Sequence, residues 1–263
     1  MESVSLRANV LGIGVDAANM ATVIAAIKGA LEKREKGYVC LGGVHGIMEA
    51  HKDSALRSVF ANALMVAPDG MPTVWVGQMQ GFAGMERVFG PDLMIEAMSS
   101  AELKGCTHFL CGGDYGVAEE LRDKLRARLP HVRIVGGYTP PFRALTEAEE
   151  AQMIEIIAQV KPDIVWVGLG TPKQDLFMSK YLPLLETTVM IGVGAAFLYH
   201  TGRLRDSPNW VKRAGLQWAD RLIQEPGRLW KRYLFANPKF LACMVLQLAG
   251  IKQYSMMEPF RDK

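Results

Sequence analysis

Short apolar runs and longer amphipathic stretches alternate along about the first 200 residues. Apolar runs bounded by Gly, Pro or Asp are typical of buried strands, and apolar residues three or four positions apart are typical of helices that face a core. The short runs predict a strand running into a turn at 10–16 and further strands at 37–41, 64–67, 106–111, 132–135, 164–167 and 189–193. The periodic stretches predict helices at 17–33, 47–63, about 90–103, 117–129, 146–160 and 175–185.

Regular alternation of strands and helices indicates βαβ units. Such units give an α/β fold with a Rossmann-like, mainly parallel sheet and helices on both faces. Ligands of such sheets bind beyond the carboxyl ends of the strands. The glycine loops at 112–116, 168–174 and 192–197 all follow predicted strands, so we expect the functional site at that edge.

The pattern changes after residue 202, where strand signals stop and Arg, Trp and Leu dominate. We expect a catalytic domain at 1–202 and a basic helical C-terminal appendage at 203–263. The appendage holds 12 Lys/Arg against 5 Asp/Glu, whereas the whole chain has a net charge of only +3. This asymmetry indicates an anionic partner. A membrane surface fits Arg and Lys beside Trp and Leu, although a solvated helix face would have the same composition.

Composition excludes several classes of protein. With 49% apolar and 22% charged residues the chain is not disordered, and its four cysteines lack zinc-like or disulfide-framework spacing. We expect no signal peptide, and the apolar run at 240–251 is too short to span a bilayer. We therefore predict a protein of a reducing compartment, soluble or peripheral on a membrane. Nucleic acid is a weaker partner because no recognised binding motif accompanies the charge.

The stretch at 66–72 carries the first candidate for chemistry. Asp69 follows an apolar run and lies between Pro68 and Gly70, and Arg87 comes eighteen residues later beside a second glycine turn. A turn former or helix N-cap is one interpretation of Asp69. The other is a general base, with Arg87 binding an anion.

Other candidates lie in the loops at the presumed ligand edge. One loop holds the hydroxyl of Thr171, the ammonium of Lys173 and the amide of Gln174, a set that suits a sugar, uracil or phosphate. The alternative interpretation is an ordinary surface loop with a solvated lysine. Gly194 lies in a stretch of small residues that follows a predicted strand, which indicates close approach to the backbone by either a ligand or a packed helix. His45 follows the loop of Gly42 and Gly43 and is either a site residue or a structural histidine.

The loop at 112–116 is a weak candidate for binding a phosphate, because it is not G-x-G-x-x-G and a tight turn explains its glycines. No D-x-D occurs in the chain, so we expect no metal site and no cofactor. Any diphosphate would then be neutralised by Arg, Lys and backbone donors.

Taken together, these motifs resemble the WecB/TagA/CpsF group, glycosyltransferase family 26. No single motif decides this, but the ordered series from about residue 40 to 240 is specific. The matching stretches, in chain order, are Val44-His45 with Glu49-Ala50, Pro68-Asp69-Gly70-Met71-Pro72, Glu86-Arg87-Val88-Phe89-Gly90-Pro91-Asp92-Leu93, Gly112-Gly113, residues 162–174, residues 192–197, and Gly215-Leu216-Gln217-Trp218 with Arg221, Glu225-Pro226, Arg228 and Arg232-Tyr233.

The resemblance implies inverting, metal-independent transfer of a sugar from a UDP-sugar to a polyprenyl-diphosphate-linked saccharide at the cytoplasmic face of the membrane. The donor sugars of this group are N-acetylmannosamine, its uronic acid and glucose. By carry-over, Asp69 is the general base and Arg87 stabilises the leaving diphosphate. The resemblance further implies that His45, Gly70, Thr171, Lys173, Gln174 and Gly194 bind substrate, and that Arg221, Arg228 and Arg232 contact the lipid or its diphosphate.

The chain departs from the family pattern at four positions. The family often has Thr and Asn where this chain has Leu41 and Gly43, Asp where it has Leu198, and Glu where it has Gln217. Loss of the Thr and Asn removes polar contacts near the sugar, whereas the predicted base and cation are kept. A non-catalytic or differently acting nucleotide-binding protein at the membrane surface is the alternative, and the oligomeric state, a homo-oligomer included, stays open.

Overall fold

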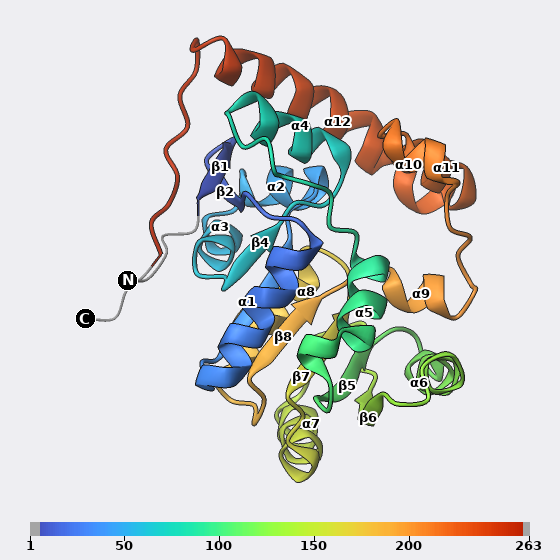
Figure 1. The fold of residues 1–263 in the computed structure, drawn as a ribbon. Coiled ribbons are helices and arrows are strands. Elements are labelled where there is room, and N and C mark those ends of the chain that lie inside the picture. Colours follow the sequence, from blue (N-terminus) through green and yellow to red (C-terminus); the bar gives the residue numbers. More distant parts are fainter. Residues whose placement is uncertain (1–5, 260–263) are drawn as a thin grey trace. The chain divides into compact units, whose positions relative to one another are not determined.

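The computed structural model describes residues 6–259 of the chain, apart from the side chain of Arg232. The fold is α/β, as the alternation predicted (Figure 1). Its strands are β1 (Arg7–Val10), β2 (Ile13–Asp16), β3 (Gly37–Leu41), β4 (Met65–Ala67), β5 (Thr107–Gly112), β6 (Arg133–Tyr138), β7 (Ile164–Gly168) and β8 (Val189–Gly192). Its helices are α1 (Met20–Lys33), α2 (Val44–Ala50), α3 (Ser54–Ala61), α4 (Met71–Met79), α5 (Gly90–Ser99), η1 (Ala101–Leu103), α6 (Val117–Arg128), α7 (Glu147–Val160), α8 (Lys173–Tyr181), α9 (Ala196–His200), α10 (Asn209–Arg213), α11 (Gln217–Gln224) and α12 (Pro226–Leu248).

The main sheet has six strands in the order β4-β3-β8-β7-β5-β6. The pairings of β3 with β8, β8 with β7, β7 with β5 and β5 with β6 are all parallel. Four of the five residues of β7 are buried, as are all four residues of β8. Strands buried in this way have continuous apolar sequences rather than alternating ones, which is why short apolar runs located them.

The N-terminal segment differs from the single strand that we predicted at 10–16. It forms an antiparallel hairpin of β1 and β2, with Leu11 and Gly12 in the turn at φ values of 55° and 83°. The side chain of Asn9 closes this turn, because its Oδ1 accepts the N–H of Gly12 at 2.8 Å. Two successive residues at positive φ are typical of a two-residue hairpin loop, and the twist of that loop matches the twist of the strands.

The predicted helix at 47–63 is wrong in its continuity, because two helices occupy that range. Asp53 separates α2 from α3, and its Oδ1 accepts the N–H groups of Ala55 (2.8 Å) and Leu56 (3.3 Å). An Asp with extended backbone that accepts these N–H groups is a helix N-cap, so it starts a new helix. Helix α4 was not predicted, although Pro72 in its first turn is a known start signal.

The chain forms two compact units. The first consists of residues 1–20, 41–89 and 205–263, and the second of residues 21–40 and 90–204. The chain therefore leaves the second unit between Leu204 and Arg205. The division into a catalytic domain at 1–202 and an appendage at 203–263 stays a prediction.

In the first unit, the C-terminal segment contacts the N-terminal hairpin. Gln247 of α12 accepts the N–H of Leu11 at 2.9 Å, and its Nε2 donates to the carbonyl oxygen of Asn9 at 2.8 Å. Residues 253–259 have no regular secondary structure, and the carbonyl of Tyr254 accepts the side-chain amide of Asn9 at 2.7 Å. Residues more than 230 positions apart are thus joined by hydrogen bonds in one unit.

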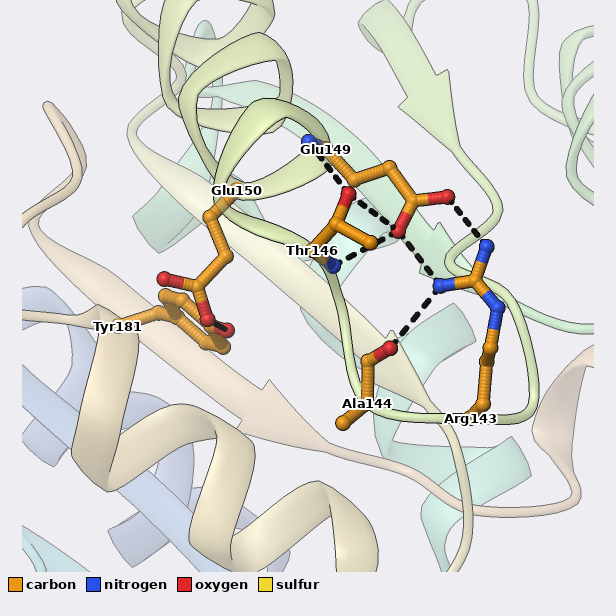
Figure 2. A network of polar contacts seen from close by, with 6 residues as sticks. All are labelled: Arg143, Ala144, Thr146, Glu149, Glu150 and Tyr181. Atoms are coloured by element: carbon orange, nitrogen blue, oxygen red, sulfur yellow. Dashed lines mark hydrogen bonds and ion pairs between the residues drawn. The ribbon is translucent and has the colours of Figure 1, made fainter.

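In the second unit, helix α7 begins with a capping box formed by Thr146 and Glu149. Thr146 Oγ1 accepts the N–H of Glu149 at 3.3 Å, and Glu149 Oε2 accepts the N–H of Thr146 at 2.8 Å (Figure 2). Arg143 donates to both oxygens of Glu149 at 2.7 Å. This guanidinium, with the Thr146 N–H, lowers the pKa of Glu149 to about 2.

The glycines that end β5 and β7 allow the two strands to lie close together. A Cβ on Gly112, at φ 134°, would lie 2.7 Å from the carbonyl of Gly168, and one on Gly168 would lie 2.8 Å from the ring of Phe197. The N–H of Gly113 donates to the carbonyl of Gly168 at 3.2 Å. Close packing at the ends of β5 and β7 therefore requires glycine at both positions.

Candidate active site

Asp69 lies at the carboxyl end of β4, in the first unit. The strand before it is fully buried, and Gly70 after it has a φ of 93° and begins α4. Gly70 occupies the N-cap position of that helix, so the interpretation of Asp69 as the N-cap residue is wrong, whereas its interpretation as a turn former stays a prediction. The side chain of Asp69 is 32% exposed, which leaves its carboxylate accessible at a strand end where ligands of parallel sheets bind.

Arg87 is brought to Asp69 by backbone hydrogen bonds on both sides of it. The N–H of Val88 donates to the carbonyl of Pro68 at 2.8 Å, and the N–H of Glu86 donates to that of Ala18 at 3.0 Å. Arg87 Nε lies 4.0 Å from Asp69 Oδ1, and the Arg87 side chain is only 13% exposed. The structure therefore brings the two predicted catalytic residues together, while their roles stay predictions.

Gln217, at the start of α11, is the partner of Arg87 that the sequence did not identify. Its Oε1 accepts from Arg87 Nη2, and the guanidinium lies over the ring of Phe89, 4.4 Å from the centroid. Since an amide is neutral, Gln217 orients the guanidinium without neutralising it. Arg87 Nε and Gln217 Nε2 are both buried and donate no hydrogen bond to the described residues. Unsatisfied buried donors are costly and occur at functional sites.

The Gly42–Gly43 loop lies against Asp69. Gly42 N–H donates to the carbonyl of Ala67 at 2.7 Å. A Cβ on Gly43 would lie 3.2 Å from the backbone oxygen of Asp69 and 3.6 Å from its Oδ2. The missing side chain at position 43 therefore leaves room beside the carboxylate. His45 follows in α2, where it lines a cavity together with residues of α12.

The remaining predicted substrate-binding residues lie in the second unit. Gln174 is 1% exposed, and its Oε1 accepts the N–H groups of Gly170 (3.1 Å) and Gly194 (2.9 Å). Gln174 Nε2 lies 3.5 Å from the hydroxyl of Thr171, and Lys173 Nζ lies 3.5 Å from the carbonyl of Phe142. Gln174 thus joins the loops after β7 and β8, so it holds the backbone of both predicted binding loops in place.

Asp175, beside Gln174, is a buried carboxylate that sequence reasoning treated only as the start of a helix. It is fully buried, and this burial raises its pKa to about 6, although the Cys40 and Thr171 side chains offset part of the shift. The sequence gives little indication that Asp175 is buried, because an Asp in the first turn of a helix favours that position at the surface as well.

The predicted lipid contacts Arg221 and Arg228 lie in the first unit and both bind Glu225. Arg221 Nη2 donates to Glu225 Oε2 at 2.5 Å, and Arg228 Nη2 donates to the same oxygen at 2.8 Å. The carboxylate offsets one of their two positive charges. The side chain of Arg232 lies outside the described residues.

Two properties of residues 6–259 complete the description. Among them, no group of three or more His, Cys, Asp or Glu side chains is placed to hold a metal ion. Within the same range, every helix is too short or too polar to cross a bilayer.

Comparison with known proteins identifies the family. The model of the glycosyl transferase WecG/TagA/CpsF family matches residues 8–254. The N-acetylglucosaminyldiphosphoundecaprenol N-acetyl-beta-D-mannosaminyltransferase of Bacillus subtilis strain 168 is 30% identical over 216 residues, which cover 81% of this chain and 80% of that protein. The protein of the same name from Bacillus spizizenii is 28% identical over 200 residues, with 75% and 74% covered. This chain therefore belongs to the WecG/TagA/CpsF family and is a glycosyltransferase.

Proposed function

We propose that the protein transfers a sugar from a UDP-sugar to a polyprenyl-diphosphate-linked saccharide during the assembly of a cell-wall polymer or exopolysaccharide. The observation that carries this proposal is the pairing of Asp69 with Arg87 at the end of β4, in a chain of this family. The names of both relatives give a lipid-diphosphate acceptor and a β-linked product, which supports the same class of acceptor here.

In the proposed reaction Asp69 takes the proton of the acceptor hydroxyl. The acceptor oxygen forms a bond to the anomeric carbon as the bond from that carbon to the diphosphate breaks. UDP leaves with the electron pair, and the configuration at the anomeric carbon inverts. A carboxylate at the end of a buried strand is both fixed and accessible, as a general base must be.

Arg87 balances the charge that grows on the leaving diphosphate. The attacking and leaving oxygens lie on opposite sides of the anomeric carbon. Arg87 therefore contacts the diphosphate through guanidinium nitrogens other than the Nε that lies 4.0 Å from Asp69 Oδ1. Its neutral partner Gln217 does not compete for the positive charge. With Arg87 in this role, transfer needs no divalent ion.

The donor sugar is selected from N-acetylmannosamine, its uronic acid and glucose. The relatives transfer N-acetylmannosamine, as their names say. Leu41 is 7% exposed and apolar, and Gly43 has no side chain, so neither gives a side-chain hydrogen bond to a sugar. We assign Thr171, Lys173 and the backbone around Gly194 to donor binding, with Gln174 holding their loops.

We further propose that the protein acts as a peripheral protein on the cytoplasmic face of the membrane. In α12 a row of apolar side chains at helical spacing is exposed: Trp230 (44%), Leu234 (60%), Leu241 (60%), Val245 (65%) and Leu248 (45%). An exposed apolar row on a basic helix is typical of interfacial helices, which place that row at the acyl boundary. A lipid-linked acceptor would then be within reach of the enzyme.

A donor screen tests the reaction. The purified protein is incubated with a synthetic polyprenyl-diphosphate saccharide and each UDP-sugar, with and without EDTA, and product is measured by mass spectrometry. We expect one UDP-sugar to be transferred with equal rates in both buffers. Loss of transfer in EDTA that Mg²⁺ restores would disprove metal independence. Absence of transfer from every UDP-sugar would disprove the assigned donor class.

Point substitutions test the membrane surface better than truncation does. Removing residues 205–263 would also remove Leu229, Phe240 and Met244, which are at most 3% exposed. We expect Leu241→Asp/Val245→Asp to weaken binding to anionic vesicles by at least about tenfold, because charged residues at the acyl boundary are unfavourable. The matched control Leu184→Asp changes a residue of the second unit that is 53% exposed. Equal binding by both variants would contradict the proposal.

A further inference from the structure

A cavity of about 310 Å³ lies between α2 and α12, inside the first unit. This volume is at the lower end of the range for small-molecule sites. The cavity lining includes His45 and Glu49 of α2, Lys52 in the turn after α2, and Lys231, Phe235 and Lys239 of α12.

The cavity carries a positive charge that nearby carboxylates do not neutralise. Lys52 Nζ pairs with Glu49 Oε1 at 3.2 Å. For Lys231 and Lys239 no carboxylate of residues 6–259 comes within 4 Å of the ammonium group. The three lysines and one glutamate of the lining give it a net charge of about +2. Such a lining attracts an anion.

The cavity borders the exposed apolar row of α12. Lys231, Phe235 and Lys239 are four residues apart and therefore lie on one face of the helix. The apolar row that contains Trp230 and Leu234 lies one position earlier, about 100° around the helix. Phe235 is itself 67% exposed. An anionic group in the cavity would thus be next to a surface suited to hydrocarbon.

We propose that this cavity binds the phosphodiester headgroup of an anionic membrane phospholipid. The proposal rests on the membrane surface assigned to α12 above. A phosphodiester carries a single negative charge, which the ammonium groups of Lys231 and Lys239 balance, while its acyl chains lie beside the apolar row. The doubly charged diphosphate of the acceptor is the other anion that this lining would attract, and the measurements with the cavity variant distinguish the two.

The first test is a titration with a water-soluble short-chain phosphatidylglycerol, below its micelle concentration, followed by NMR on the ring of His45. We expect saturable shifts that Lys231→Gln/Lys239→Gln weakens by at least about tenfold, because hydrogen bonds to charged groups are among the stronger ones. The control Arg213→Gln/Lys252→Gln removes the same charge from exposed positions outside the cavity and should bind like wild type. Short-chain phosphatidylcholine should cause no saturable shift.

Two results would overturn the proposal. One is equal binding of phosphatidylglycerol by the cavity variant and its control. Binding would then depend on the overall charge of the protein and not on the cavity. The other is an unchanged phosphatidylglycerol affinity together with a raised KM for the polyprenyl-diphosphate acceptor in detergent, which would assign the cavity to the acceptor. The lipid titration needs no turnover, so it remains decisive even if the proposed transfer reaction fails. Thermal unfolding of each variant confirms that it is folded.

Discussion

An arginine–carboxylate pair in the second unit and one in the first unit differ in how many of their hydrogen-bonding groups are already used. In the second unit, Arg143 and Glu149 share two hydrogen bonds of 2.7 Å, and Thr146 completes the carboxylate's contacts (Figure 2). In the first unit, Arg87 Nε and Asp69 Oδ1 are 4.0 Å apart, and that Nε–H donates no hydrogen bond to the described residues.

The difference separates a structural pair from a pair available to a substrate. A bidentate pair within a capping box has its oxygens and N–H groups already used, so it holds a loop to a helix. In the looser pair, the Arg87 Nε–H donates no hydrogen bond to the described residues, so this donor and the positive charge stay available to a reaction. The same two residue types therefore predict function only once their contacts are known.

The largest expected effect is on catalysis and breaks the pair in the first unit. Asp69→Asn keeps the shape of the side chain but removes the base, so we expect turnover to fall by about 10²–10⁴-fold. Steady-state kinetics with the UDP-sugar selected by the screen measures this. The matched variant Glu149→Gln should keep wild-type turnover. Equal losses in both variants, or full activity of Asp69→Asn, would remove the distinction between the pairs.

Asp175 extends the comparison to a buried carboxylate that forms no ion pair with an arginine among residues 6–259. Burial raises its pKa from 3.8 to about 6 in the folded protein. The folded state therefore binds this proton more tightly than the unfolded state, and the resulting stability is present below pH 3.8 and lost as the pH rises through about 6. The difference between these limits is on the order of 3 kcal/mol.

Asp175→Asn should be more stable than wild type at pH 7.5, and the difference should shrink towards pH 5. Urea unfolding at both pH values measures the two free energies of unfolding. The control Asp163→Asn changes the carboxylate that accepts the N–H of Thr107 at 2.7 Å. That variant should be less stable than wild type at both pH values. A pH-independent effect of Asp175→Asn would refute the raised pKa of the buried Asp175 carboxyl.

Gln217 distinguishes the pair in the first unit further, because its neutral amide binds the Arg87 guanidinium without offsetting the positive charge. Gln217→Ala removes the acceptor of Arg87 Nη2, and we expect KM for the UDP-sugar to rise by roughly tenfold, as for loss of a hydrogen bond to a charged group. Gln224→Ala, in the same helix, serves as the control. An unchanged KM in Gln217→Ala would show that Arg87 needs no such partner.

The smallest effect concerns the structural pair. Thr146→Ala removes the N-cap hydroxyl of α7 and should cost about 1 kcal/mol of unfolding free energy. Turnover should not change. Differential scanning calorimetry and the transfer assay together check this. A loss of activity without a loss of stability would mean that the capping box also serves the reaction.

Local sequence patterns predicted most of the fold for physical reasons that particular residues illustrate. Thr146 and Glu149 predict the start of α7 because both partners of a capping box lie within one helical turn. The runs at β7 and β8 predict buried strands because both faces of a parallel sheet are covered. The break at Asp53 and helix α4 were missed because a short apolar-rich stretch is compatible with more than one arrangement of helices.

The sequence by itself determined most strands of the main sheet, several of its helices, the turn that holds Asp69, and the resemblance to the family. These depend on neighbouring residues, whose spacing fixes which face of a strand or helix they share. Only the tertiary structure decided that Gln217 binds Arg87 across 130 positions, and that Lys231 and Lys239 line a cavity with His45. Such partners are set by packing between distant segments, which no local pattern encodes.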